Sequence, residues 1–346
     1  MLRYLVKKLF YGFFVLLGVV VLVFALFQGF GDPAQLVMGQ TGNKATEAAI
    51  RKELYLDQPK GAQFLHYLND LSPVSRYTAE AQQERGIPGW RVGGDWVLKA
   101  PYLRRSYQTK RPVGELLMQA LPGTLLLASA AMFLAVLLGI PLGMLAAVRK
   151  GSWLDSSAIV TSILGISAPS FFMGIIIAYV FGFLLTGWTG LSLTGSWFAI
   201  DMEGHRRLTL QNLILPAITL GIRPLAIITQ LTRSALLDVL QQDYIRTAYA
   251  KGLSRRAVLW RHALRNALNP VITAITGWFA ELLAGAFFIE YIFGWQGIGK
   301  LTVDALEKLD FPVVMGSVLL SATFFILVNL LADLLYGLVD PRVRMR

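Results

Sequence analysis

The sequence predicts an all-α polytopic membrane protein with six transmembrane helices. The chain has 346 residues, of which 55% are hydrophobic and only 15% are charged, whereas soluble domains carry about 25% charged residues. Six stretches are mostly apolar over the roughly 20 residues that a helix needs to cross a bilayer. They are 9–30, 121–148, 157–186, 213–232, 270–289 and 313–337.

Two of these stretches need separate comment. The first, within residues 1–30, follows three basic residues and so resembles a signal peptide. Its apolar core is longer than the usual 7–15 residues or so, and no A-x-A cleavage motif follows it, so we expect an uncleaved anchor helix. The fourth is the weakest, because Pro216, Gly221 and Arg223-Pro224 interrupt it. Such breaks are tolerated where neighbouring helices or water satisfy the freed backbone groups.

The distribution of Lys and Arg predicts that both termini are cytoplasmic. Basic residues concentrate in the short cytoplasmic loops of membrane proteins. Fifteen of them lie before the first span, after the second, between the fourth and fifth, and after the sixth. The opposite short loops, 187–212 and 290–312, hold four. Residues 31–115 then form an extracytoplasmic loop, and the same bias explains the net charge of +11 without a nucleic-acid partner.

The connection 236–269 is predicted to fold as two helices around a glycine hinge. Asp243 is expected to cap a short helix over 244–251, and Gly252 suits the left-handed residue just past its end. Ser254 is expected to cap a second helix, which Asn269-Pro270 closes or kinks.

The side chains of this connection favour a docking element without deciding what it docks to. In the second helix an apolar stripe recurs at spacings of three and four residues. It consists of Ala257, Trp260, Leu264 and Leu268. In the first helix, small Ala248 and Ala250 allow close approach of another surface. A rigid cytoplasmic contact element and an amphipathic helix lying on anionic lipid both fit this pattern.

The stretch DYIRTAYAKGLSRR (243–256), with HALRNALNP (262–270) behind it, resembles the cytoplasmic coupling loop of ABC-transporter permeases. The similarity is to the dipeptide/oligopeptide/nickel branch, and most of all to its dipeptide permease B subunits. The broader family pattern begins Glu-Ala-Ala and has a glycine four residues after the second alanine. Here Arg246-Thr247-Ala248 stands in the first three places and Gly252 matches the glycine, a departure that is usual for the peptide branch.

Further matches to the same family occur in the same order along most of the chain. They are GDPA (31–34), GIPLGMLAAVRKGSWLD (139–155), PLAIITQLTRSALLDVLQQDYIRTA (224–248), LLAGAFFIEYIFGWQGIGK (282–300) and LLADLLYGLVDPRVR (330–344). The family's six spans agree with the number obtained from hydropathy.

The resemblance implies an ABC importer type I permease architecture in the inner (plasma) membrane of a bacterium or archaeon. It implies a transport subunit that is not itself an enzyme and has no cofactor. A second related permease subunit, two cytoplasmic ABC ATPases that bind ATP and Mg²⁺, an extracytoplasmic binding protein and membrane lipid are the implied partners. The implied ATPase-coupling residues are Asp243, Tyr244, Arg246, Thr247, Ala248, Ala250, Lys251 and Gly252. The cargo (dipeptide, oligopeptide, nickel complex or another small solute) and the identity of the second permease stay open.

Residues 116–346 would then form a five-helix permease core, and the outer loop departs from the family. About 30 residues near 72–103 lengthen it and are rich in Gly, Pro, Trp and Tyr. A surface elaboration explains this insert, because loops tolerate insertion. Added contact area for a binding protein or a lipidated partner explains it as well.

Charged residues inside the spans are the candidates for the substrate pathway. Glu281 lies about halfway across the fifth span, where a carboxylate is costly and functional by default. It could meet a peptide ammonium group or a cation, pair with Arg223, or contact pore water. Arg223 itself either lines the pathway or caps carbonyls that Pro224 frees. Glu290 is expected to be solvated at the outer interface, and Asp333 to have a structural role.

No catalytic or metal-binding motif is present. GWQGIGK (294–300) has the spacing of a phosphate loop but lacks the following Ser or Thr and a preceding strand, so we expect a compact Gly-rich turn at the outer mouth of the pathway. The three histidines show no ligand spacing, and there are no cysteines. An ion-gradient-driven secondary transporter is the alternative, and it would favour internal repeats and several intramembrane charges.

Overall fold

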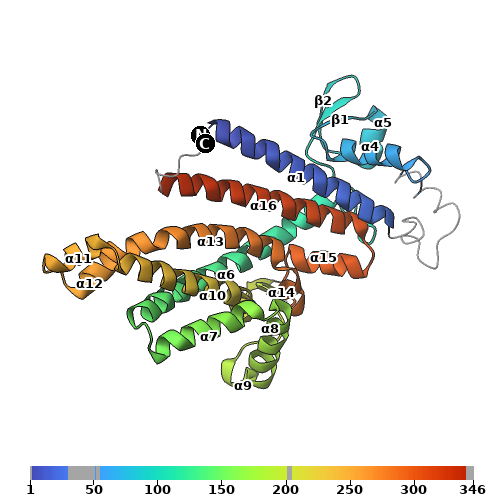
Figure 1. Ribbon diagram of the computed structural model, residues 1–346. Coiled ribbons are helices and arrows are strands. Elements are labelled where there is room, and N and C mark those ends of the chain that lie inside the picture. The colour runs from blue at the N-terminus through green and yellow to red at the C-terminus, as the bar shows by residue number, and fades with distance from the viewer. Residues whose placement is uncertain (1, 30–50, 52–54, 201–204, 340–346) are drawn as a thin grey trace. The chain divides into compact units, whose positions relative to one another are not determined.

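The computed structural model describes residues 2–29, 51, 55–200 and 205–339, and within them the chain is mainly helical (Figure 1). The longer helices are α1 (Leu2–Gly29), α6 (Val113–Val148), α7 (Trp153–Ser167), α8 (Ser170–Ile177), α10 (Ile214–Leu240), α13 (Arg265–Gly285) and α16 (Phe311–Val339). The shorter ones are α4 (Lys60–Leu71), α5 (Ala79–Arg85), α9 (Thr186–Thr189), α11 (Asp243–Ala250), α12 (Arg255–Ala257), α14 (Phe287–Ile292) and α15 (Ile298–Glu307). The GDPA stretch and the end of the last quoted motif lie outside the described residues.

Three segments with non-α hydrogen bonding complete the helices. The π-helical turn η1 (Ala178–Leu184) extends α8, and the 3₁₀ turn η2 (Leu210–Leu213) leads into α10. The π-helix η3 (Val258–Leu264) joins α12 to α13. A separate two-stranded antiparallel sheet is formed by β4 (Phe198–Ile200) and β5 (Arg206–Leu208).

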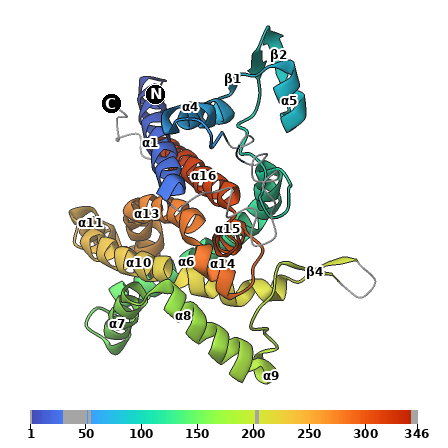
Figure 2. The same cartoon turned by 90° about the vertical axis from the view of Figure 1, so that its right-hand side faces the viewer.

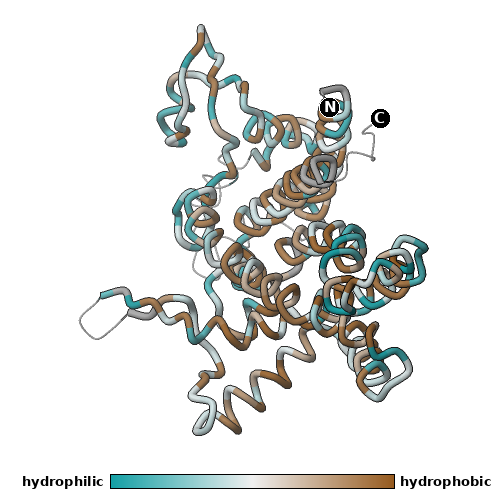
Figure 3. The backbone as a smooth tube through the Cα atoms, turned by 90° about the vertical axis from the view of Figure 1, so that its left-hand side faces the viewer, coloured by the Kyte–Doolittle hydropathy of each residue, from teal (hydrophilic) through white to brown (hydrophobic). Residues whose placement is uncertain are grey.

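Four helices in the described part of the chain are long and apolar enough to cross a membrane. They are Tyr4–Gln28, Val113–Val148, Leu210–Leu240 and Phe311–Leu334. Figure 3 shows the hydrophobic residues running along the long helices. The chain is therefore a helical membrane protein, as predicted. The predicted fifth span, 270–289, falls on α13, which is not among these four.

The predicted third span, 157–186, is broken rather than continuous. α7 and the helix Ser170–Leu184 meet at an angle of 106°, and together they would make one bent span. Ala168 at the break is extended, with φ −76° and ψ 132°. Pro169 follows it, and a residue before proline is disfavoured in the helical region.

One compact unit consists of Met1–Gly12, Leu121–Lys300 and Ser321–Arg346. Within it α10 packs against α7, α8, α13 and α14 (Figures 1 and 2). Glycines bring α6 and α10 together, since a Cβ at Gly143 would overlap the Thr229 carbonyl and Gly221 lies against the Ala131 carbonyl. Small residues permit such close approach between membrane helices. Lys8 and Asp333 form an ion pair of 2.7 Å in the same unit, in line with the structural role predicted for Asp333.

The other compact unit consists of Phe13–Ala120 and Leu301–Leu320. In its core the last turns of α1 pack against α4 and the start of α16. The ring of Phe24 stacks on Tyr67 at 5.8 Å between centroids, and Phe27 meets Phe311 edge-on at 5.6 Å. α4 is thereby fixed to the part of α1 that lies within a membrane span.

The predicted insert, 72–103, folds into a small subdomain of this unit. Strands β1 (Val74–Arg76), β3 (Trp96–Leu98) and β2 (Trp90–Gly93) form an antiparallel sheet in the order β1-β3-β2. α5 connects β1 to β2. Thr78 caps its first turn, and Gly86 ends it in the left-handed conformation.

Buried charges tie α4 to this sheet. The Asp70 carboxylate is 1% exposed, accepts hydrogen bonds from Tyr77 (2.7 Å) and Arg104 (2.9 Å), and lies 3.7 Å from Arg85. The Lys99 ammonium donates to the Asp70 carbonyl oxygen at 2.5 Å. Burial lowers the pKa of Lys99 to about 8, and burial raises the pKa of Tyr77. A buried carboxylate with this many donors fixes the register of the elements that supply them.

Candidate functional site

The segment between α10 and α13 is a locally rigid element built around α11. Lys251, the C-cap residue just after α11, donates its N–H to the Thr247 carbonyl at 3.0 Å. Gly252 follows with φ +79°, and its N–H donates to the Tyr249 carbonyl at 2.9 Å. The predicted left-handed glycine is confirmed, and it is a conformation that side chains with a Cβ disfavour.

The predicted caps of the two helices have different outcomes. Asp243 does not cap α11, because the N-cap is Gln242 and no side-chain bond is made there. Asp243 lies in the first turn instead, where a negative charge still favours the positive end of the helix dipole. The Ser254 cap is confirmed, since its hydroxyl accepts from the Ala257 N–H at 3.4 Å.

The apolar stripe predicted for the second helix is only partly correct. Trp260 of that stripe is 53% exposed, whereas Val258, Ala263 and Ala267 are buried. The five-residue step from Val258 to Ala263 follows from η3, whose i→i+5 bonding widens the turn and moves the buried face. The helix also continues through Pro270, which does not close it.

α11 has one buried and one exposed face. Ile245 (1% exposed) and Ala248 (6%) pack in a cluster with Leu236, Val258 and Ala263. The other predicted coupling residues are exposed: Asp243, Tyr244, Arg246, Thr247, Ala250, Lys251 and Gly252. Ala248 therefore supports the element from inside the chain, while Ala250 is open to a partner.

A side-chain hydrogen bond that the sequence did not indicate holds α11 against α13. The Asn266 amide donates to the Tyr244 hydroxyl at 2.8 Å and to the His262 carbonyl at 3.2 Å. Asn266 thus joins the exposed face of α11 to the start of a helix that runs into the membrane region.

An ion pair joins α7 to α10 in the same unit. Arg233 donates to both carboxylate oxygens of Asp155, at 2.5 and 2.9 Å, and Asp155 is 3% exposed. The Gly151 N–H donates to the same carboxylate at 2.9 Å. Sequence reasoning missed this pair, although Ser152 and Asp155 have the S-x-x-D spacing of a capping box.

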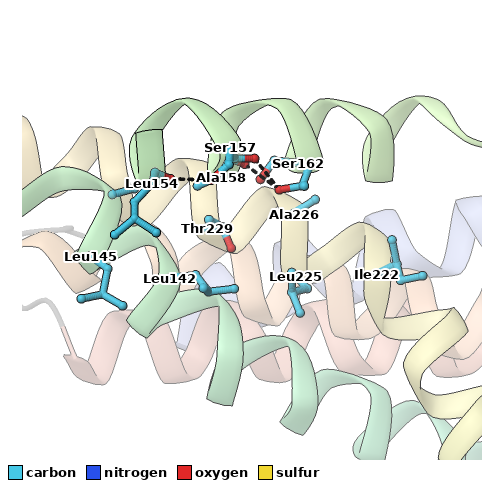
Figure 4. Close-up of a pocket in the computed structure, with 12 residues that line it drawn as sticks. Leu142, Leu145, Leu154, Ser157, Ala158, Ser162, Ile222, Leu225, Ala226 and Thr229 are labelled. Atoms are coloured by element: carbon cyan, nitrogen blue, oxygen red, sulfur yellow. Dashed lines mark hydrogen bonds between the residues drawn. The ribbon is translucent and has the colours of Figure 1, made fainter. Parts of the chain in front are cut away.

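A cavity of about 220 Å³ lies between α6, α7 and α10 (Figure 4). Its lining is mostly apolar, with four hydroxyl-bearing residues: Ser157, Thr161, Ser162 and Thr229. Ser157 and Thr161 donate to carbonyls of their own helix. The buried Thr229 hydroxyl has no partner in the described part of the chain. Among the described residues, those that line this cavity carry no ionisable side chain.

The two charged candidates inside the membrane segments do not pair with each other. The Arg223 guanidinium lies over the Trp278 ring of α13, 5.4 Å from its centroid, a cation–π contact. α10 continues unbroken through Pro224, so Arg223 is not needed as a cap for a broken helix. Glu281 is exposed, and among the described residues it has no ion-pair partner. Trp278 was not singled out by the sequence.

α13 carries a polar and small-residue stripe on one exposed face. Its members recur every fourth residue: Asn269, Thr273, Gly277 and Glu281. A four-residue step advances about 40° beyond a full turn of the helix, so consecutive members lie side by side and form one stripe that winds slowly around α13. No part of the chain that the structure describes covers this face.

Glu290 was predicted to be solvated, and this is wrong. It is 0% exposed and accepts hydrogen bonds from the Thr124 hydroxyl (2.7 Å) and the Lys300 N–H (3.1 Å). A Cβ at Gly297 or Gly299 would overlap its carboxylate or neighbouring backbone. The Gly-rich stretch is a compact turn, as predicted. The anion that its backbone holds is the chain's own carboxylate, placed at the N-terminus of α15.

The residues that the structure describes contain no group of three or more His, Cys, Asp or Glu side chains placed to hold a metal ion.

Two family profiles and several characterised proteins match the chain. The profile described as binding-protein-dependent transport system inner membrane component matches residues 139–345, and its N-terminal counterpart matches residues 1–128. The dipeptide transport system permease protein DppB of Escherichia coli K12 is 38% identical and covers 99% of both chains. The di/tripeptide permease DppB of Pseudomonas aeruginosa is 38% identical over 94% of each chain. The glutathione permease GsiC of Salmonella typhimurium is 35% identical over 99% of each.

A solved structure shares the fold. The inward-facing MetNI methionine ABC transporter in its CY5 native crystal form aligns with a TM-score of 0.51 at 17% identity. The alignment covers 66% of this chain and 97% of that one. The helical unit therefore has the fold of an ABC importer permease.

Proposed function

The chain belongs to the family of binding-protein-dependent transport system inner membrane components, and from that premise we propose that it carries short peptides. It is a multi-pass permease of the inner membrane, a transport subunit and not an ATPase. The names of its relatives specify dipeptides, di- and tripeptides, and glutathione. These solutes are all short peptides, which supports peptide cargo.

The observation that carries the proposal is the rigid, two-faced α11. Its inner face is packed into the chain and its outer face is exposed, while the Tyr244–Asn266 bond and the Gly252 turn fix its direction. We assign this outer face to docking of a cytoplasmic ABC ATPase. In this arrangement α13 forms the fifth of six spans and both termini are cytoplasmic.

The substrate path is assigned to the polar stripe of α13. Glu281 and Arg223 would line it, with a second, related permease subunit on the opposite side and an extracytoplasmic binding protein delivering the peptide. ATP binding closes the two ATPases, and their closure moves α11 and with it the helices on either side. Coupling of this kind is reciprocal for binding, so substrate loading also alters nucleotide affinity.

Reconstitution of the permease pair with its ATPases and binding protein in lipid vesicles tests this function. Uptake of a dipeptide should require ATP, and Arg246→Glu should abolish both uptake and substrate-stimulated ATP hydrolysis. The matched control is Lys60→Glu, the same charge reversal at an exposed residue of α4, which should leave both unchanged. Normal uptake by Arg246→Glu would remove α11 from the docking role, and ATP-driven uptake of non-peptide solutes alone would refute the cargo.

A further inference from the structure

The small sheet β1-β3-β2, in the unit formed by Phe13–Ala120 and Leu301–Leu320, has an uncovered apolar face. Five apolar side chains form it and are 44–79% exposed: Val74, Trp90, Val92, Trp96 and Leu98. The strand register places Val74 and Trp90 on either side of Leu98, and Arg76 beside Trp96. Residues directly opposite on antiparallel strands share a face. We call these five residues the tryptophan face.

The opposite face of the sheet is covered. Val97 is 0% exposed and packs with Tyr77 and Ile87. Arg91 donates from Nε to the Gln82 side chain of α5 at 3.0 Å, which places α5 on this side. A contiguous apolar patch that the subdomain leaves open marks a surface for a protein or a membrane.

The position of the sheet along α1 decides between these two classes. α4 runs directly into β1, and it packs against Val20, Val23 and Phe27 of α1. These three residues lie inside the membrane-spanning segment Tyr4–Gln28. Figure 1 shows the sheet beside α1 rather than beyond its end, with α5 on the side nearer that end. The tryptophan face is therefore turned towards the bilayer that surrounds α1.

We propose that the tryptophan face lies in the lipid interface at the C-terminal end of α1. Tryptophan is enriched at the membrane–water boundary, where its ring contacts acyl chains and its N–H stays near the headgroups. Arg76, whose side chain is 71% exposed, lies next to Trp96 and supplies a cation for lipid phosphate. Its nearest carboxylate, Asp95, is itself exposed and 3.7 Å away, a weak competitor. The sheet follows α4, which packs against the membrane-spanning segment of α1, so contact with lipid requires no second protein.

A site-directed spin label tests the proposal in the full-length chain, which has no native cysteine. Val92→Cys is labelled with a nitroxide after reconstitution into vesicles of phosphatidylethanolamine and phosphatidylglycerol. The matched control is Glu80→Cys, exposed on α5. For each label, the accessibility to oxygen is divided by the accessibility to a water-soluble nickel chelate. This ratio should be several-fold higher for the Val92 label than for the Glu80 label. Equal accessibility at the two sites would overturn the proposal.

Two further measurements ensure that the conclusion does not depend on a single substitution or on the proposed cargo. Leu98→Cys, on the same face, should give the same lipid-type accessibility as Val92→Cys, and a water-type result at both positions would exclude membrane contact. Purified binding protein is then added to the vesicles. If the labels are open to the nickel chelate until that protein is added and protected afterwards, the face docks a protein and the lipid proposal is wrong.

Discussion

The hydroxyl of Thr124 donates to the carboxylate of Glu290 at 2.7 Å, joining residues 166 positions apart. The same hydroxyl accepts from the Ile298 N–H at 2.8 Å, at the start of α15. The Trp295 indole donates to the Gly123 carbonyl at 2.8 Å. One short stretch of α6 therefore holds the whole Gly-rich turn, and this arrangement makes the contribution of Thr124 measurable.

Thr124→Val should destabilise the permease without changing the shape of the side chain. It removes a donor to a buried carboxylate and the acceptor of a buried N–H, which costs about 1–3 kcal/mol for each unsatisfied group. The midpoint of thermal unfolding in detergent should fall by several degrees, whereas Thr124→Ser, which keeps the hydroxyl, should stay near the wild type. A valine variant as stable as the wild type would show that this bond contributes nothing.

Removing either partner of the Asp155–Arg233 pair alone should lower the free energy of unfolding more than removing both partners together. Asp155→Ala leaves a partly buried guanidinium without its carboxylate, and Arg233→Ala leaves a buried carboxylate without its guanidinium. We expect a coupling energy of about 0.5–3 kcal/mol in a double-mutant cycle of unfolding in detergent. Strictly additive effects of the two single changes would mean that the bidentate geometry has no energetic value.

Gly252→Val should separate ATP hydrolysis from transport. At φ +79° a residue with a Cβ carries a penalty of about 1–2 kcal/mol, so the valine variant should reorient α11 relative to α12. The number of ATP molecules hydrolysed per peptide imported should rise. Gly252→Asn is the control, because asparagine tolerates the left-handed conformation, and its coupling ratio should stay close to normal. A normal ratio in the valine variant would argue against a fixed hinge.

The unit that contains Lys99, Phe13–Ala120 with Leu301–Leu320, should become more stable as the pH rises from about 8 to 10. Lys99 has an ordinary pKa of 10.5, and burial lowers it to about 8 in the folded protein. Between these values the unfolded state binds more protons, so the free energy of unfolding increases with pH. Above about pH 10 the trend should reverse, because Tyr67 and Tyr77, whose pKa values burial raises, ionise first in the unfolded chain.

Thermal unfolding followed by tryptophan fluorescence across that range measures the effect. Lys99→Met should abolish the rise, since it removes the titrating ammonium and keeps most of the side-chain volume. Lys60→Met, at an exposed position of α4, should retain it. An unchanged rise in the Lys99 variant would assign the pH dependence to another group.

The features of the candidate site that could be predicted from the sequence are local ones. The predictions for Gly252 and Ser254 were correct, because a left-handed turn and an N-cap depend on only a few neighbouring residues. The predicted N-cap at Asp243 was wrong by one position. The N-cap residue is Gln242, and its side chain makes no capping hydrogen bond. The shift of the buried face at Val258 could not be anticipated, because a stripe at spacings of three and four residues assumes 3.6 residues per turn and the π-helix η3 departs from that value.

Features that depend on distant partners were missed. In the sequence, Glu290 looks like an ordinary charged residue near the end of a span. Only the structure shows that Thr124 and the Gly-rich turn enclose it. The hydrophobic stretch 157–186 was recognised in the sequence, but its bend at Ala168-Pro169 appeared only in the structure, although the proline itself was a visible signal.

Glu281 remains the residue on which the proposed substrate path can be tested most directly. It is exposed on the polar stripe of α13, and among the described residues no cation neutralises it. If its carboxylate receives the ammonium group of a peptide, Glu281→Gln should raise the KM for dipeptide uptake by about tenfold, the value of one charge-assisted hydrogen bond. Glu281→Asp keeps the charge and should lose less. An N-acetylated dipeptide lacks the ammonium group, so its uptake should be equally slow in the wild type and in Glu281→Gln. A loss of uptake that is the same for free and acetylated peptides would instead mean that Glu281 supports the helix or hydrates the path, and does not recognise the cargo.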